Sequence, residues 1–154
     1  KAKVIYALEP YSKAFEELTD NVRDFELDKI RPYRLALSNY NGEGNLVISE
    51  GRGGNKLVAG GGSDKTEKVQ VKTLAQFIID ENIQRVNILK IDIENTEDEV
   101  FTADDFKEIA NRIDFIIGEH ANEEVAHTLR ITGFNFIRTP RGFYAKRKRS
   151  NVKN

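Results

Sequence analysis

The sequence predicts an α/β fold, in which a mostly parallel sheet ends in an antiparallel carboxyl-terminal hairpin. Short apolar segments alternate with amphipathic helical patterns, which is typical of parallel βαβ units. Two further strand-like segments flank Pro140-Arg141-Gly142 near the end of the chain. With 154 residues, of which 39% are hydrophobic, the chain can form one domain of ordinary size. We expect that domain over residues 1–148 and a basic tail over residues 149–154.

The first part of the chain predicts a strand, a helix and a second strand. Residues 3–8 form an apolar run that Glu9 and Pro10 end. Ser12 is expected to cap the helix that follows. The apolar face of this helix has the spacing i, i+4, i+7, i+11 and consists of Tyr11, Phe15, Leu18 and Val22. Residues 33–38 predict the next strand.

Two antiparallel strands are predicted in the middle of the chain, over residues 46–49 and 69–72. The segment 51–62 between them contains six of the eleven glycines and is interpreted as a hairpin tip. It does not match a phosphate-binding loop, because no Gly-Lys-Ser/Thr follows. Thr73 then begins a helix with a capping box that includes Gln76.

The second half predicts a central strand over residues 86–94, with a helix that begins at Thr96. Residues 113–117 repeat this pattern and are followed by Glu119 and His120.

A last helix is expected to be capped by Asn122 and to stop at Gly133. The closing hairpin is predicted from residues 134–138 and 143–146.

Composition excludes several classes of function. The 24 basic and 25 acidic residues give a net charge of −1, which argues against nucleic-acid binding. No apolar run approaches the roughly 18 residues of a membrane span. There is no cysteine, so the redox compartment is not fixed and the cytoplasm is the default expectation. The chain starts at Lys1 and contains no methionine, so we expect further sequence upstream.

Polar residues that could bind a ligand follow several predicted strands, where α/β sheets bind their ligands. Glu9 could accept hydrogen bonds from the ribose of NAD or S-adenosylmethionine, or could be a surface acid before a proline turn. Lys90, Asp92 and Glu94 share one face of their strand, which is costly unless they are paired or line a cleft. The alternative is an ion pair that braces the sheet edge.

His120 and Glu119 are candidates for proton transfer, because histidine exchanges protons near neutrality. His127, in the last helix, is interpreted as a solvent-facing or packing residue. Seven acidic residues lie between Asp92 and Phe106 and could bind a divalent cation. The alternative is that Glu97 and its acidic neighbours complement a helix N-terminus.

Five motifs together resemble the FkbM family of methyltransferases, in order and spacing, from residue 4 to about residue 145. They are Ala7-Leu8-Glu9-Pro10, Leu35-Ala36-Leu37-Ser38 with Gly42-Glu43, Val71-Lys72-Thr73-Leu74, Leu89-Lys90-Ile91-Asp92-Ile93-Glu94 with Glu97, and Glu119 with Gly133-Phe134. The resemblance implies a Rossmann-like class I fold and S-adenosylmethionine as cofactor. It also implies methyl transfer to a hydroxyl of a sugar, polyketide or related small-molecule acceptor.

By this resemblance, the cofactor would be bound by Glu9, Ala36, Leu37 and Asp92. Asp92, Glu119 and His120 would form the catalytic group, while Lys90, Glu94 and Asn95 would contact the substrate. No metal ligand is implied.

The chain departs from the family pattern in two places. Asn95-Thr96 stands where the family has Gly-Ala, and asparagine is the best substitute for glycine at positive φ. The glycine-rich first β-α unit, which would cradle the methionine end of the cofactor, should lie upstream of Lys1.

Three other functions remain open from the sequence. They are a non-catalytic domain that keeps the fold without cofactor, an NAD-type oxidoreductase, and a metal-dependent hydrolase. The hydrolase would use Asp92, Glu94, Glu97, Glu119 and His120.

Overall fold

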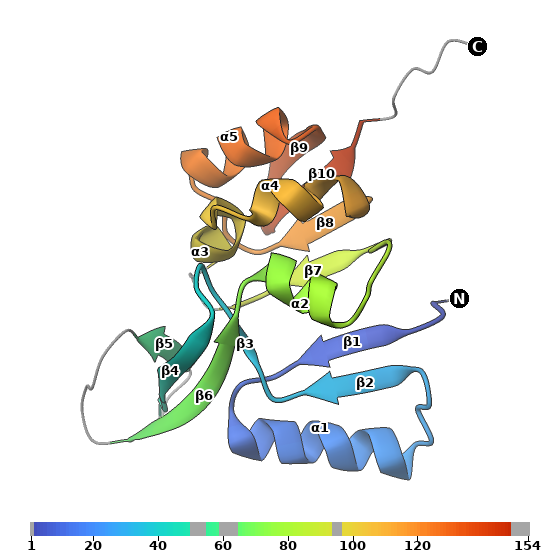
Figure 1. Cartoon of the computed structure of the whole chain (residues 1–154), viewed down its shortest axis with the longest axis vertical. Coiled ribbons are helices and arrows are strands. Elements are labelled where there is room, and N and C mark those ends of the chain that lie inside the picture. The colour runs from blue at the N-terminus through green and yellow to red at the C-terminus, as the bar shows by residue number, and fades with distance from the viewer. Residues whose placement is uncertain (1, 50–54, 59–64, 94–96, 149–154) are drawn as a thin grey trace. The chain divides into compact units, whose positions relative to one another are not determined.

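The computed structural model describes residues 2–49, 55–58, 65–93 and 97–148 (Figure 1). The backbone forms two compact units, of mixed α/β structure. The first unit comprises residues 1–37 and 41–72, and the second comprises residues 38–40 and 73–154.

The first unit begins with a β-α-β arrangement. Strands β1 (Ile5–Leu8) and β2 (Ile30–Tyr33) are parallel, and helix α1 (Ser12–Asp24) connects them and packs against β2 (Figure 1). The predicted apolar face of α1 is half-buried, as the spacing indicated. The predicted cap is wrong, because Ser12 is the first helical residue and its side chain donates to Glu67 instead.

A second sheet of the first unit has the order β3-β6-β4-β5. Its strands are β3 (Ala36–Leu37), β4 (Gly42–Val47), β5 (Lys56–Val58) and β6 (Thr66–Lys72). β4 is antiparallel to β5 and β6, whereas β3 is parallel to β6. The strand predicted over residues 33–38 is therefore divided between two sheets. Arg34 lies at the division and donates to Glu67 of β6, which holds the chain toward the second sheet.

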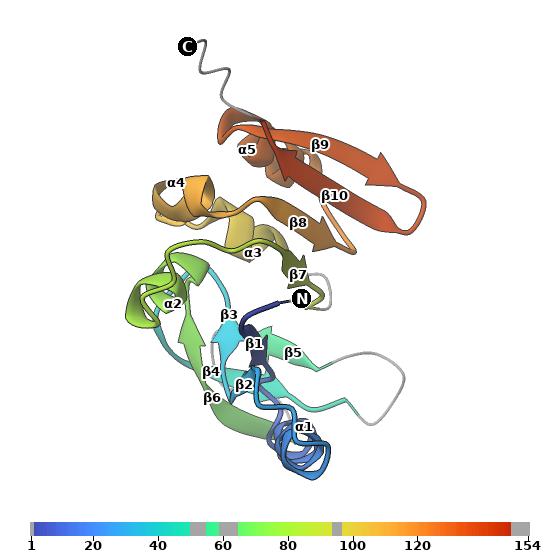
Figure 2. The ribbon, with the colours of Figure 1, turned by 90° about the vertical axis from the view of Figure 1, so that its right-hand side faces the viewer.

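The sheet of the second unit has the order β7-β8-β10-β9. It contains β7 (Leu89–Ile91), β8 (Phe115–Gly118), β9 (Phe134–Thr139) and β10 (Gly142–Arg147). β7 and β8 are parallel, and β10 is antiparallel to both β8 and β9 (Figure 2). The antiparallel carboxyl-terminal hairpin is thus confirmed.

The strand predicted over residues 86–94 is shorter than expected. It was predicted to be central, but among the described strands it lies at one edge of its sheet. Val86 forms only an isolated bridge with Ile113, and the Asn87 side chain donates to Asp114. These contacts leave three residues, Leu89–Ile91, for the continuous ladder.

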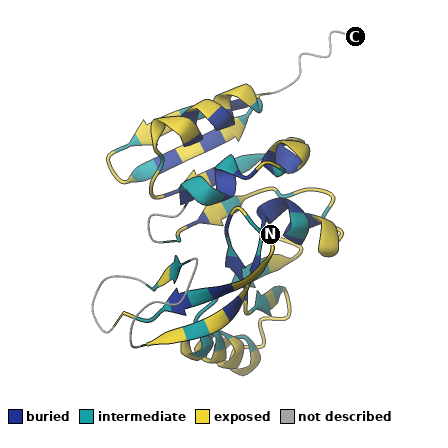
Figure 3. Cartoon of the chain, turned by 60° about the vertical axis from the view of Figure 1, so that its left-hand side comes forward, coloured by how far each residue is buried: buried dark blue, intermediate teal, exposed yellow. Residues whose placement is uncertain are grey.

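Helices cover one face of this sheet and enclose the core of the second unit (Figure 3). The helices are α2 (Leu74–Asp80), α3 (Glu97–Thr102), α4 (Phe106–Ile109), a short 3-10 helix (Ala110–Arg112) and α5 (Glu123–Ile131). The caps predicted at Thr73 and Asn122 are confirmed, since Thr73 accepts from the Gln76 amide at 3.1 Å and Asn122 from the Val125 amide at 2.9 Å. Gly133 ends α5 at φ +95°, as predicted.

Arg147, the last residue of β10, is half-buried. Its guanidinium donates to the carbonyls of Ile113, Thr132 and Ala110, and lies 4.3 Å from the centroid of the Phe134 ring. Burial lowers the pKa of Arg147, and Asp114 partly offsets this. Arg147 therefore joins β10 to the core instead of facing solvent.

Candidate functional site

The carboxyl ends of β7 and β8 lie side by side in the second unit. The two strands are parallel, and Ile91 is paired with Gly118. Asp92 follows Ile91, while Glu119 and His120 follow Gly118. Glu119 and His120 both lie close enough to Asp92 to lower its pKa. The structure therefore brings together the three residues that the sequence singled out as the catalytic group.

Asp92 is paired with Lys90, whose ammonium nitrogen lies 2.6 Å from the Asp92 Oδ2 atom. The hydrogen bond from Lys90 lowers the pKa of Asp92, burial opposes this, and Glu119 and His120 lower it further. Asp92 is consequently ionised near neutral pH. The two side chains are 68% and 47% exposed, so the pair adds little stability. This geometry matches the ion pair at the sheet edge that the sequence left as an alternative.

An open cavity of about 560 Å³ lies at the end of β8. It is lined by residues 119–121 and by residues 138–143 of the β9–β10 hairpin. These two segments are in close contact, because a Cβ atom at Gly142 would lie 2.3 Å from the Gly118 carbonyl oxygen. Gly142 has φ +134°, a conformation that only glycine adopts readily. The backbone thus fixes the hairpin turn against the end of β8.

Two arginines of the hairpin line this cavity and differ in their partners. Arg138 forms an ion pair with Glu123 at 3.0 Å and donates to the Ala121 carbonyl at 2.9 Å. Arg141 is exposed, and within the described residues its guanidinium has no acidic partner. Sequence reasoning interpreted Arg141 only as part of a turn. The available signal was the presence of two arginines within a four-residue segment around that turn.

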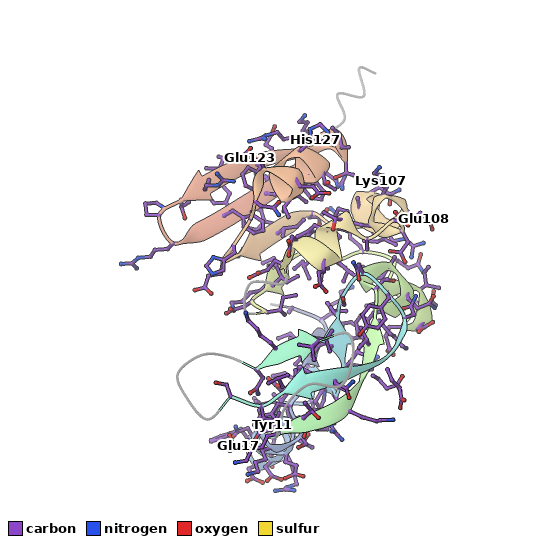
Figure 4. The ribbon with its side chains drawn as sticks, turned by 90° about the vertical axis from the view of Figure 1, so that its left-hand side faces the viewer. Tyr11, Glu17, Lys107, Glu108, Glu123 and His127 are labelled. Carbon is purple, nitrogen blue, oxygen red and sulfur yellow. The ribbon has the colours of Figure 1, made fainter. Side chains whose placement is uncertain are left out.

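Helix α5 carries the second histidine. His127 is exposed on α5, on which Glu123 also lies (Figure 4). His127 is absent from the residues that line the 560 Å³ cavity. The interpretation of His127 as solvent-facing is confirmed.

Glu97 is a buried carboxylate in the first turn of α3. It is 1% exposed, and neither of its oxygens has a hydrogen-bond donor among the residues that the structure describes. Its neighbour Glu99 accepts a hydrogen bond of 2.5 Å from Ser38, which is itself fully buried. Burial, with the charge of Glu99, raises the pKa of Tyr40. Acidic residues do occupy the first turn of α3, as expected, but Glu97 is not exposed to solvent there.

The remaining predicted cofactor residues lie in the first unit. Glu9 follows β1, and its Oε1 accepts from the Tyr11 amide at 2.8 Å. Its Oε2 has no donor in the described part of the chain. Ala36 and Leu37 form β3, where Ala36 is 6% exposed and Leu37 is half-buried. Because Glu9 and Asp92 belong to different units, their convergence on one ligand stays a prediction.

Some predicted residues lie outside the described residues. They include Glu94 and Asn95, Thr96 of the second capping box, and most of the glycine-rich segment 51–62. Among the residues that are described, no three His, Asp or Glu side chains are arranged to hold a metal ion.

Comparison with known proteins assigns a family to this chain. The model of the methyltransferase FkbM domain matches residues 1–138. The chain belongs to the FkbM methyltransferase family. The match includes every residue discussed above except those after residue 138. No curated protein and no solved structure matches the chain.

The family identifies this FkbM chain as a methyltransferase and confirms the resemblance found in its motifs. Asp92, Glu119 and His120 all lie within the matched region. In the described portion of the chain, no helix combines the length and apolar character needed to cross a membrane.

Proposed function

We propose that this FkbM-family chain is an S-adenosylmethionine-dependent O-methyltransferase with a Rossmann-like class I arrangement. Its acceptor is a hydroxyl group of a sugar, a polyketide or a related small molecule. The observation that carries the proposal is the convergence of Asp92, Glu119 and His120 at the carboxyl ends of parallel β7 and β8. Ligands of open α/β sheets bind at such strand ends.

The residues of the first unit fit the proposed cofactor. Glu9 follows a parallel strand, and the Tyr11 amide holds one of its carboxylate oxygens. The other oxygen can accept hydrogen bonds from ribose hydroxyls. Leu37 is half-buried and offers apolar contact for an adenine ring, whereas the buried Ala36 would act through the backbone. When bound, S-adenosylmethionine supplies a methyl group activated by the positive sulfonium.

The protein's own contribution is orientation and proton removal. His120 is the proposed base, because it is exposed at the cavity and imidazole accepts protons near neutrality. Asp92 is a weaker base, since Lys90 stabilises its ionised form. We propose that the negative charge of Asp92 orients His120 and that Lys90 holds the Asp92 carboxylate in place.

Single replacements separate these roles. His120→Gln should lower the rate of methyl transfer from radiolabelled S-adenosylmethionine to a panel of sugar and polyketide alcohols by about 10²–10⁴-fold. The matched control is His127→Gln, the exposed histidine on α5, which should leave the rate unchanged (Figure 4). If neither His120→Gln nor Asp92→Asn slows the chemical step, the assignment of the base is wrong.

A further inference from the structure

The lining of the cavity beside β8 includes two arginines, Arg138 and Arg141, together with Glu119 and His120. Methyl transfer to a neutral alcohol does not by itself require these two guanidinium groups. We propose that this cavity binds an anionic group of the methyl acceptor, either a carboxylate or a phosphate, with Arg141 as its main ligand. The inference rests on the proposed function, because it places the acceptor in the same cavity as His120.

The backbone around Arg141 is held in one conformation. The Arg141 amide donates to the Thr139 hydroxyl oxygen at 3.3 Å, and the Thr139 hydroxyl donates to the Gly142 carbonyl at 3.1 Å. Gly142 in turn contacts the end of β8 closely. The position at which the Arg141 side chain leaves the turn is therefore fixed by the fold, which reduces the entropy lost on binding.

The guanidinium of Arg141 is available to a ligand. Other arginines of this unit already have partners: Arg138 pairs with Glu123, and Arg85 pairs with Asp114 at 2.7 Å. Within the described residues, the Arg141 guanidinium has no carboxylate partner. A free guanidinium offers a planar fork of N–H donors that matches a carboxylate or phosphate with two parallel hydrogen bonds.

Glu119 is the one acidic residue among those that line the cavity. Arg138, although paired, supplies a second positive side chain on the hairpin wall. Two guanidinium groups and one carboxylate therefore line the cavity, and the guanidinium groups attract an anion.

The volume of the cavity is suitable for a small acceptor that carries both an anionic group and a hydroxyl group. Its volume of about 560 Å³ lies within the range of about 300–1,000 Å³ found for small-molecule sites. His120 and Arg141 both line this cavity. An acceptor anchored by its anionic group at Arg141 thus presents its remaining part, including a hydroxyl, to His120.

Nuclear magnetic resonance titration tests the inference without the natural acceptor. Inorganic phosphate and acetate are titrated separately into ¹⁵N-labelled protein at constant ionic strength. At least one anion should produce saturable shifts that concentrate at the amides of residues 119–121 and 138–143. The anion that binds more tightly then distinguishes phosphate from carboxylate recognition.

Three variants make the test specific. Arg141→Gln should weaken the tighter anion about tenfold, as expected for loss of a charged hydrogen-bond donor. Arg141→Lys should retain part of the affinity, because it keeps the charge but not the fork. The control is Lys107→Gln, an exposed basic residue of α4 outside the cavity, which should bind as the parent does (Figure 4).

The inference is overturned if neither anion gives saturable shifts, or if Arg141→Gln binds both anions as tightly as the parent. It can fail separately from the proposed function. Calorimetric binding of S-adenosylhomocysteine without any anion site would reject the inference alone. An anion site at Arg141 without any S-adenosylhomocysteine binding would support the site and reject the methyltransferase mechanism.

Discussion

Gly118 of β8 lies directly against the ring of Phe143 in β10. A Cβ atom added at Gly118 would come 2.3 Å from the Phe143 Cε1 atom and 2.5 Å from its Cζ atom. Both residues are buried, and they are paired across the two antiparallel strands. The absence of a side chain at Gly118 thus lets the hairpin pack at the strand end that carries Glu119 and His120.

We predict that Gly118→Ala destabilises the second unit by about 1–3 kcal/mol, because the added methyl group overpacks the core. Urea unfolding followed by circular dichroism measures this change. The double variant Gly118→Ala/Phe143→Leu should be less destabilised than the sum of the two single variants, since the smaller side chain makes room for the methyl group. An undiminished free energy of unfolding for Gly118→Ala would contradict the packing described.

Glu67 of β6 stabilises the beginning of α1. Its carboxylate accepts from both the amide and the hydroxyl of Ser12 at 2.7 Å, and from Arg34 at 3.3 Å. Burial raises the pKa of Glu67, but the Ser12 hydrogen bonds and Arg34 outweigh it, so the pKa is lowered. An anion at a helix N-terminus is stabilised by the free amides there.

Glu67→Ala should therefore cost about 1–2 kcal/mol in unfolding free energy and speed amide hydrogen exchange in α1. The matched control is Glu43→Ala, which removes an exposed pair with Lys68 at 3.6 Å. That change should cost less than about 0.5 kcal/mol. Equal losses for the two variants would show that Glu67 does not cap α1.

Asp114 makes the stability of the folded protein depend on pH. The hydrogen bond from Arg85 lowers its pKa, burial opposes this, and Asn87, Arg85 and Arg147 contribute further. The pKa of Asp114 is lower in the folded state than in the unfolded state, where it is about 4. Its contribution to stability is therefore complete above the unfolded-state pKa and is lost as the pH falls through the folded-state pKa. Melting temperatures of the parent should hence decline below about pH 4.

Asp114→Asn should be less stable than the parent at pH 7, and the difference should narrow as pH falls. Because Arg85 is 69% exposed, we expect a difference of no more than about 1 kcal/mol at pH 7. Asp104→Asn, at an exposed carboxylate of the same unit, is the control and should show no such convergence. A constant difference across the pH range would contradict the assignment.

The buried carboxylate of Glu97 predicts an unusual result. Neither oxygen has a donor within the described chain, so burial of this group costs free energy. Glu97→Gln removes the ionisable group and should raise the unfolding free energy by about 1 kcal/mol or more. Glu99→Gln should have the opposite effect, because Glu99 accepts a hydrogen bond from buried Ser38.

Thermal and urea unfolding of both variants under identical conditions shows whether the two changes in unfolding free energy have opposite signs. A loss of more than about 1 kcal/mol for Glu97→Gln would mean that Glu97 has a stabilising partner.

Features that depend on neighbouring residues in the sequence could be predicted. Thr73 and Asn122 cap their helices through amides three residues later, and the closing hairpin is defined by its own turn. The juxtaposition of Asp92 with His120 followed from one general rule, that parallel strands end at the same edge.

Features that depend on distant residues could not be predicted. Ser12 has the composition of a cap, but Glu67, 55 residues away, uses its hydroxyl as a donor. The division of residues 33–38 between two sheets and the burial of Arg147 likewise depend on partners far along the chain. The difference between Arg141 and Arg138 could not be predicted either, because it depends on the ion pair that Arg138 forms with Glu123.

The most direct test of the central claim is calorimetric binding of S-adenosylhomocysteine to the full natural protein and to its Glu9→Gln variant. We expect saturable binding to the parent protein, weakened about tenfold or more by Glu9→Gln through loss of the charged acceptor for the ribose hydroxyls. Absence of binding to the parent, or equal affinity in the variant, would contradict it.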